Sequence, residues 1–199
     1  MSFLEYRVKT VPSGLAKVLY VNWALVILLV AVASAGFLML TSVAGGDTGT
    51  WAEPQAKRFA AGLVVLFFVA FVPIWFWRNM AGLAYLVSLL LLVLVDLFGS
   101  VGMGAQRWLD LGFITLQPSE MMKFTLVMML AAYYDWLDPK KTSRPLWVTI
   151  PVLMIAAPTV LVLMQPNLGT SVVMLAGGAI VMFLAGVSVW YFAVVIGLG

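Results

Sequence analysis

The sequence is a series of apolar runs, each long enough to cross a lipid bilayer, separated by short polar connections. A membrane-spanning helix needs about 20 apolar residues, because each residue advances the helix by about 1.5 Å. The runs that meet this length are residues 22–42, 59–77, 80–98, 119–137, 146–164 and 169–187. A seventh run starts near Val189, and we expect it to continue in a longer protein of which this chain is the amino-terminal part. The sequence therefore predicts an all-α, polytopic bundle of transmembrane helices, with residues 1–199 in a single membrane domain.

Composition supports this fold class and excludes several kinds of catalytic site. Hydrophobic residues make up 64% of the chain and charged residues 10%, whereas soluble domains average about 45–50% and about 25%. The sequence has no cysteine and no histidine, which excludes thiolate nucleophiles, Ser–His hydrolases and thiolate or histidine metal sites. No cofactor is evident, and a requirement for a divalent metal stays open. The basic residues lie in short clusters between apolar runs, so we expect membrane lipids and not nucleic acid as partners.

The distribution of Lys and Arg predicts a cytoplasmic amino terminus. If successive runs cross the membrane in alternate directions, one side carries Arg7, Lys9, Lys17, Arg78, Lys140, Lys141 and Arg144. The other side carries Lys57, Arg58, Arg107 and Lys123. Because cytoplasmic loops are enriched in Lys and Arg, we assign the first set to the cytoplasm. The outer connections are then residues 43–58, 99–118 and 165–168.

The densest group of polar residues lies in one outer connection and the helix after it, residues 104–124, which read GAQRWLDLGFITLQPSEMMKF. Pro118 suits the first turn of a helix, where Glu120 would lie near the positive end of the helix dipole. Lys123 follows three residues later, on the same helix face. Two interpretations stay open: the two charges neutralise each other at the membrane surface, or they line a cavity for a polar or anionic headgroup. Arg107 is either a bidentate phosphate partner or an anchor at the membrane interface.

A second polar segment, MQPNLGTS, lies at residues 164–171. It places the amides of Gln165 and Asn167 at membrane depth, on the same outer side as the first segment. A tight turn alone would explain this sequence, but the shared side favours a common site. Asp96, inside the third run, is a further charge for which the sequence names no partner.

Both segments resemble motifs of the SEDS family (shape, elongation, division and sporulation), which comprises the RodA, FtsW and SpoVE peptidoglycan polymerases. Residues 104–124 are similar to the pattern GAxRWxxLGxxxxQPSExxKx, and residues 165–170 are similar to QPDLGT. The first outer loop, GGDTGTWAEPQAKRF, is more similar to the RodA branch than to the FtsW branch. The resemblance implies a fold of about ten membrane helices, each of about 20 residues.

The resemblance also implies a function in cell elongation and the maintenance of cell shape, in the inner (plasma) membrane of a bacterium. Such proteins polymerise lipid II, an undecaprenyl-pyrophosphate-linked disaccharide peptide, on the outer face of the membrane, together with a class B penicillin-binding transpeptidase. By match to the family motif, Glu120 and Lys123 fall in the central cavity and are candidates for supporting roles in catalysis. The candidates for substrate binding are Arg107, Trp108, Gln117, Ser119, Gln165 and Asn167.

Two departures from the family limit what this chain is expected to do alone. Asn167 stands where the family usually has Asp, which argues against a catalytic base at this position. The Asp usually assigned as catalytic lies in an outer loop after the seventh span, so we expect the main base to lie beyond residue 199. Two other functions stay open: a lipid II transporter (flippase), or a membrane scaffold for a transpeptidase. A transporter would be expected to have matched polar breaks on both faces, and a scaffold would not need Glu120 and Lys123 at membrane depth.

Overall fold

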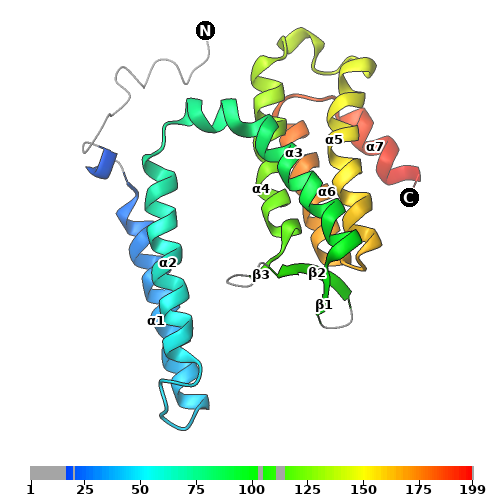
Figure 1. Cartoon of the computed structure of the whole chain (residues 1–199). Helices are drawn as coiled ribbons and strands as arrows, with labels where there is room; N and C mark the ends of the chain where they lie inside the picture. Colours follow the sequence, from blue (N-terminus) through cyan, green and yellow to red (C-terminus); the bar gives the residue numbers. More distant parts are fainter. Residues whose placement is uncertain (1–16, 20, 103–104, 111–114, 199) are drawn as a thin grey trace. The chain divides into compact units, whose positions relative to one another are not determined.

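The computed structural model describes residues 17–19, 21–102, 105–110 and 115–198. The described residues form seven α-helices and three short β-strands (Figure 1). Helices account for nearly all of this regular structure, so the predicted all-α class is confirmed. The chain divides into two compact units, residues 1–73 and residues 74–199. The single membrane domain expected from the sequence stays a prediction.

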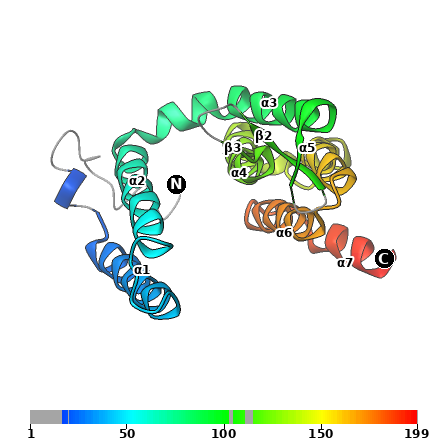
Figure 2. The same ribbon diagram turned by 60° about the horizontal axis from the view of Figure 1, so that its bottom comes forward.

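The first unit is a hairpin of two helices, α1 (Trp23–Val43) and α2 (Ala52–Phe71). The side chain of Asn22 caps α1 by accepting a hydrogen bond from the third residue after it, which satisfies one of the free N–H groups of the first turn. Gly45 and Gly46 have φ angles of 68° and 96°, which favour glycine, and they turn the chain between the helices. The two helices run side by side in both views (Figures 1 and 2).

Aromatic contacts join the two helices of the hairpin. The rings of Trp23 and Phe67 have centroids 6.0 Å apart, and those of Phe37 and Phe59 are 5.9 Å apart. Such pairs contribute about 0.5–1.5 kcal/mol beyond the area that they bury. They connect α1 and α2 at two levels along the hairpin, which fixes the two helices against each other.

The boundary predicted near Arg78 is wrong. Helix α2 ends at Phe71, and α3 spans Ile74–Phe98, so Arg78 lies inside a helix and not in a connection. The cause is Pro73, because a residue that precedes proline is sterically disfavoured in the helical conformation. Val72 is accordingly extended, with φ −68° and ψ 132°. Proline therefore ends the second span before residue 77, where the apolar pattern alone predicted one continuous run over residues 59–77.

The second unit begins with α3 and then forms a small antiparallel sheet before the next helix. The strands are β1 (Ser100–Gly102), β2 (Ala105–Asp110) and β3 (Thr115–Leu116), in the order β1-β2-β3. Leu109 pairs with Leu116, and β2 packs against both α3 and α4. The apolar pattern did not predict these strands, which form in the polar connection where the helical period is interrupted.

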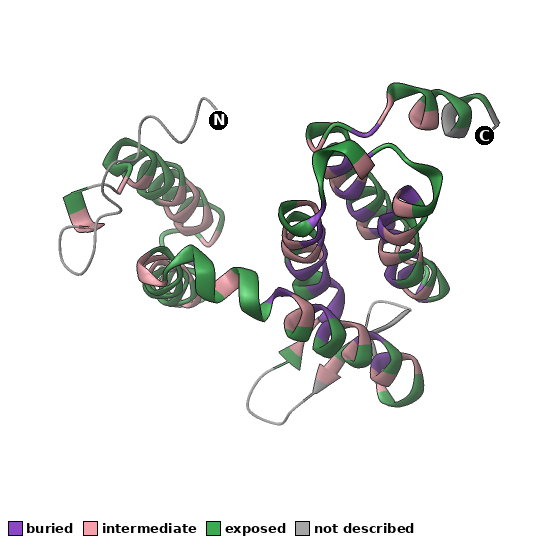
Figure 3. Cartoon of the chain, turned by 90° about the horizontal axis from the view of Figure 1, so that it is seen from above, coloured by how far each residue is buried: buried purple, intermediate pink, exposed green. Residues whose placement is uncertain are grey.

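Four further helices complete the second unit: α4 (Pro118–Trp136), α5 (Pro145–Met164), α6 (Leu168–Leu184) and α7 (Val189–Leu198). Helices α3 to α6 pack on one another around a shared apolar core. The least exposed large side chains of this core are Leu92, Met122, Leu126, Leu130, Val162 and Met174. Figure 3 shows the buried positions gathered in this bundle.

Four of the described helices, α1, α2, α3 and α5, are long and apolar enough to cross a membrane. Helix α6 is equally apolar but shorter, at 17 residues. Helix α4 has 19 residues and carries three charges, Glu120, Lys123 and Asp135. Consecutive apolar helices of this length make the chain a multi-pass membrane protein, as the sequence predicts.

Candidate functional site

The start of α4 has the local structure that its sequence predicts. Gln117 is extended, with φ −106° and ψ 102°, and Pro118 occupies the first turn. Proline is tolerated there because its missing N–H group would have had no partner inside the helix. Glu120 lies in the same turn, where the helix dipole favours a negative charge. These features fix the point at which the chain leaves β3 and enters the bundle.

Glu120 and Lys123 form an ion pair on one face of α4, with 2.8 Å between Lys123 Nζ and Glu120 Oε1. The Glu120 side chain is 52% exposed and that of Lys123 is 26% exposed. The neutralising contact expected from their spacing therefore exists, and it leaves both groups accessible. An ammonium has three donors and a carboxylate two acceptor oxygens, so each group can also contact a ligand.

Ser119, next to the ion pair, is buried inside the bundle. Its hydroxyl oxygen has no hydrogen-bond partner in the part of the chain that the structure describes. A buried polar group without a partner is uncommon and indicates a local constraint. Its role in substrate binding stays a prediction.

The strand β2 brings the other residues of the first motif to the start of α4. Trp108 lies on this strand and is exposed. Arg107 also lies on β2, but its side chain is outside the described part of the structure. Residues 103–104 and 111–114 are outside the described part as well. Because β2 pairs with β3, which leads into Gln117, the backbone of both residues is held near the beginning of α4.

The second polar motif lies at the same end of the bundle, in the turn between α5 and α6 (Figure 1). Gln165 is buried, and its Nε2 donates a hydrogen bond of 3.4 Å to the carbonyl oxygen of Leu92 on α3. Asn167 caps α6: its side-chain oxygen accepts from the Thr170 N–H at 3.4 Å. Asn and Asp are about equally good in this position. The replacement of the family's Asp by Asn therefore preserves the start of α6 while removing a charge.

Asp96 lies half-buried near the end of α3, again at the end of the bundle that carries the strands. It makes no ion pair with any described residue. A carboxylate at a helix carboxyl terminus faces the negative end of the dipole and is disfavoured there. Within the described ranges, no three acidic side chains lie close enough together to hold a metal ion.

The comparisons with known proteins agree with this arrangement. The chain is 36% identical over 166 residues to the peptidoglycan glycosyltransferase MrdB of Escherichia coli K12, an alignment that covers 82% of this chain and 44% of MrdB. It is 33% identical over 174 residues to the probable peptidoglycan glycosyltransferase FtsW of Escherichia coli O6:H1, covering 84% of this chain and 42% of that protein. The chain thus spans less than half the length of these relatives.

Solved structures share the fold as well. The crystal structure of the rod shape determining protein RodA of Thermus thermophilus matches with a TM-score of 0.74 and 31% identity, over 88% of this chain and 58% of RodA. A chain of a peptidoglycan synthase complex matches with a TM-score of 0.76 and 31% identity, over 89% of this chain and 51% of that chain. The family model of the FtsW, RodA and SpoVE cell cycle proteins matches residues 16–199. With nearly its whole length matched, this chain belongs to the FtsW/RodA/SpoVE family, as its two polar motifs predict.

Proposed function

We propose that this chain supplies the amino-terminal part of a peptidoglycan glycosyltransferase that polymerises lipid II during cell elongation. The observation that carries the proposal is the accessible Glu120–Lys123 ion pair at the start of α4, beside the strands and at the same end of the bundle as Asn167. The named glycosyltransferase MrdB, at 36% identity over 82% of this chain, supports the reaction. The likeness to RodA of Thermus thermophilus supports the role in shape.

The chemistry of glycan polymerisation suits these groups. A hydroxyl of one sugar attacks the anomeric carbon of another, the bond from that carbon to the pyrophosphate breaks, and the hydroxyl proton passes to a base. Negative charge grows on the departing pyrophosphate, and a fixed cation stabilises it. In our proposal Lys123 and Arg107 contact the pyrophosphate, Glu120 orients Lys123 or the attacking hydroxyl, and the base lies beyond residue 199.

We further propose that the strands β1 to β3 face the outside of the cell and that the amino terminus is cytoplasmic. Lys140, Lys141 and Arg144 support this orientation, because they follow α4 at the opposite end of the bundle and Lys and Arg are enriched in cytoplasmic loops. Arg7 and Lys9, which also support it, lie outside the described residues. A class B penicillin-binding transpeptidase is the proposed partner, supported by the likeness to a synthase complex that coordinates polymerization and crosslinking.

The proposal is tested by measuring glycan polymerisation from labelled lipid II. The protein is expressed from its complete reading frame and purified with its transpeptidase partner, whose crosslinking activity is blocked. We expect Lys123→Ala and Glu120→Ala to lower the rate by about 10²–10³-fold, the usual cost of removing one group that stabilises a transition-state charge. The matched control is Lys57→Ala, which breaks the exposed Glu53–Lys57 ion pair of 2.6 Å on α2 and should leave the rate unchanged.

Three outcomes would overturn all or part of the proposal. Unchanged polymerisation by folded Lys123→Ala and Glu120→Ala proteins would remove these residues from the site. No polymer from the unaltered protein, together with movement of lipid II across vesicle membranes, would replace the polymerase with the transporter. Binding of the transpeptidase with neither activity would leave a scaffold.

A further inference from the structure

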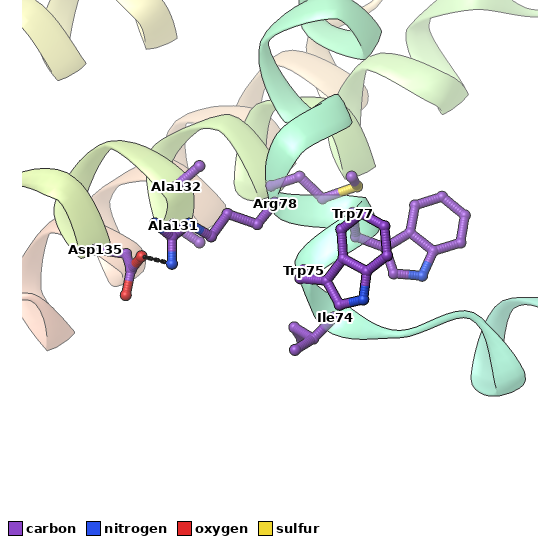
Figure 4. A pocket seen from close by; sticks show the side chains of 8 residues that line it. Ile74, Trp75, Trp77, Arg78, Ala131, Ala132 and Asp135 are labelled. Atoms are coloured by element: carbon purple, nitrogen blue, oxygen red, sulfur yellow. Dashed lines mark ion pairs between the residues drawn. The ribbon is translucent and has the colours of Figure 1, made fainter. Parts of the chain in front are cut away.

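Another accessible ion pair lies at the opposite end of the bundle, in the lining of a pocket between α3 and α4. The pocket has a volume of about 450 Å³ and is lined by Ile74, Trp75, Trp77, Arg78, Met128, Ala131, Ala132 and Asp135. Arg78 on α3 reaches Asp135 on α4, with 2.9 Å between Nη1 and Oδ2 (Figure 4). The family motifs lie elsewhere, so the proposed polymerase site does not account for this pocket.

The lining of the pocket combines one ion pair with apolar side chains. The side chains of Arg78 and Asp135 are 62% and 54% exposed, and neither forms a further hydrogen bond or ion pair with a described residue. The remaining lining is apolar, and two of its residues are alanines, which leave room beside α4. Trp75 and Trp77 lie in the first turn of α3, where indole rings are typical of the boundary between lipid headgroups and acyl chains. The pocket thus has the polarity profile of the membrane surface itself.

The ion pair leaves hydrogen-bonding capacity on both partners. A guanidinium has five N–H donors and a carboxylate about four acceptor positions, and the single contact between Arg78 and Asp135 uses one of each. The free donors suit a phosphate, which Arg can bind through two parallel hydrogen bonds. The free oxygen suits an ammonium group that has N–H donors. A ligand that satisfies both must carry the two charges a short distance apart.

We propose that this pocket binds a phospholipid with a phosphoethanolamine headgroup. The phosphate contacts Arg78, the ammonium contacts Asp135, and an acyl chain lies along Ala131, Ala132 and Met128. A purely anionic headgroup such as phosphoglycerol places no cation near Asp135 and meets its negative charge. A phosphocholine headgroup has the same net charge as phosphoethanolamine, but its quaternary nitrogen has no N–H to donate. The pocket therefore discriminates among lipids by both charge and hydrogen bonding.

The test is lipid competition on the purified full chain, with the lipids that remain bound counted by native mass spectrometry. The chain is exposed to equal amounts of phosphatidylethanolamine, phosphatidylglycerol and phosphatidylcholine. We expect phosphatidylethanolamine to be retained about fivefold over each of the others, which corresponds to about 1 kcal/mol of discrimination. Equal retention of the three lipids would overturn the proposal.

Single substitutions test the ammonium contact and the phosphate contact of the headgroup separately. Asp135→Asn should reduce the preference over phosphatidylglycerol to about one, because the amide neither attracts the ammonium nor repels the anion, a change of about 1 kcal/mol. Arg78→Gln should lower the retention of both phosphatidylethanolamine and phosphatidylglycerol. Ala132→Leu fills the pocket without changing a charge and should lower the retention of phosphatidylethanolamine, so that its preference over the other two lipids falls. Glu53→Gln, in the ion pair on α2, is the matched control and should leave the ratios unchanged.

A purely structural ion pair would give a different result. If Arg78 and Asp135 serve only to join α3 to α4, their substitution lowers the thermal stability of the chain but leaves the lipid ratios as they are. Unchanged ratios in folded Ala132→Leu would therefore exclude the lipid site, and so would unchanged ratios in folded Asp135→Asn. Because Ala132→Leu keeps the ion pair, it decides the question even if the charge variants do not fold.

Discussion

Both units of the chain are built of apolar helices, but they differ in how many residues those helices bury within the chain. In the hairpin, α1 has no buried residue and α2 has one, Ala52. In the second unit, α4 alone buries seven residues, although it also carries three charges. Of the four candidate spans, α1 is the most apolar and buries nothing within the chain. Figure 3 shows the same contrast in the distribution of buried positions.

This difference shows that hydropathy measures how well a helix suits lipid, and not how well it packs against protein. Inside a bilayer, lipid tails are as apolar as leucine, so helices gain little by burying apolar surface against one another. Association depends on close packing, small residues and hydrogen bonds between helices. The second unit has these features, and both polar motifs are on it.

The largest expected effect comes from removing a packed leucine. Leu126 on α4 is 1% exposed, whereas Leu28 on α1 is 60% exposed. Leu126→Ala should lower the free energy of unfolding by about 2–5 kcal/mol, because it leaves a cavity in the bundle. Leu28→Ala removes the same atoms from an open surface and should change it by about 0.5 kcal/mol or less. Thermal unfolding of the purified proteins in one detergent measures both, and equal losses would show that the hairpin packs as tightly as the bundle.

Adding a single methyl group tests the same contrast in the opposite direction. A Cβ built on Gly178 of α6 would lie 2.5 Å from Ile155 Cδ1 on α5, whereas one on the neighbouring Gly177 would lie 3.9 Å from its nearest neighbour, on Val127. Gly178→Ala should therefore cost about 1–3 kcal/mol in stability through overpacking. Gly177→Ala, on the same helix, and Gly36→Ala, on α1 with nothing within 4 Å, should be tolerated.

The melting temperatures of these three alanine variants give the comparison directly. A drop confined to Gly178→Ala would confirm that α5 and α6 approach through this glycine. Equal melting temperatures for Gly177→Ala and Gly178→Ala would contradict the close approach of α5 and α6. They would show that the bundle packs no more tightly than the hairpin.

A smaller effect is expected where the chain connections of the second unit meet. The Ser143 hydroxyl, before α5, accepts from the Ser188 N–H at 2.9 Å and donates to the Gly186 carbonyl at 3.2 Å. Tyr191 on α7 donates to the Ser143 carbonyl at 3.0 Å. These bonds join residues more than forty positions apart. Ser143→Ala should cost about 0.5–1.5 kcal/mol for each hydroxyl bond lost.

Hydrogen exchange at the start of α7 is the suitable measurement for Ser143→Ala. Faster exchange of the Ser188 amide than in the unaltered chain is expected, because its acceptor has been removed. Thr149→Ala is a matched control, since its hydroxyl bonds only the Pro145 carbonyl within α5. Unchanged exchange in Ser143→Ala would show that another contact holds the α6–α7 turn.

Much of the fold follows from the sequence, because membrane length, proline and helix-start chemistry are local properties. The beginning of α4 at Pro118 and the turn at Asn167 come from such rules. The prediction at Arg78 is wrong because the apolar pattern continues through Pro73, although the residue before a proline usually leaves the helix. The strands β1 to β3 were missed because short ladders depend on pairing between segments and leave little periodic signal.

The candidate site was predicted less completely than the fold. The Glu120–Lys123 contact follows from their spacing on one helix face. The burial of Gln165 against Leu92 depends on how α5 packs on α3, and nothing local encodes it. The Arg78–Asp135 pair was missed for the same reason, since it joins two helices whose contact is a tertiary property. Substrate roles for the motif residues stay predictions until the polymerisation assay is made.

The smallest expected effect lies in the hairpin, where the polar contacts of the connecting loop are local. The Asp47 carboxylate accepts from the Gly49 N–H at 2.9 Å and from the Thr50 hydroxyl. The Thr50 hydroxyl, and then the Gly49 N–H, hold the pKa of Asp47 below its usual value of 3.8. A lowered pKa means that these bonds stabilise the folded loop above that value and are lost as the pH falls through the lower, folded-state pKa.

A pH titration of the Asp47 carboxyl carbon by NMR therefore should give a midpoint below 3.8. Thr50→Ala removes the larger cause and should move the midpoint up toward that value, while Thr41→Ala, whose hydroxyl bonds the Phe37 carbonyl in α1, should not move it. Because the turn closes within four residues, its loss at low pH should leave the bundle of α3 to α6 folded. Simultaneous melting of that bundle at the same pH would show that the two units share their stability, and the contrast between them would then be one of packing alone.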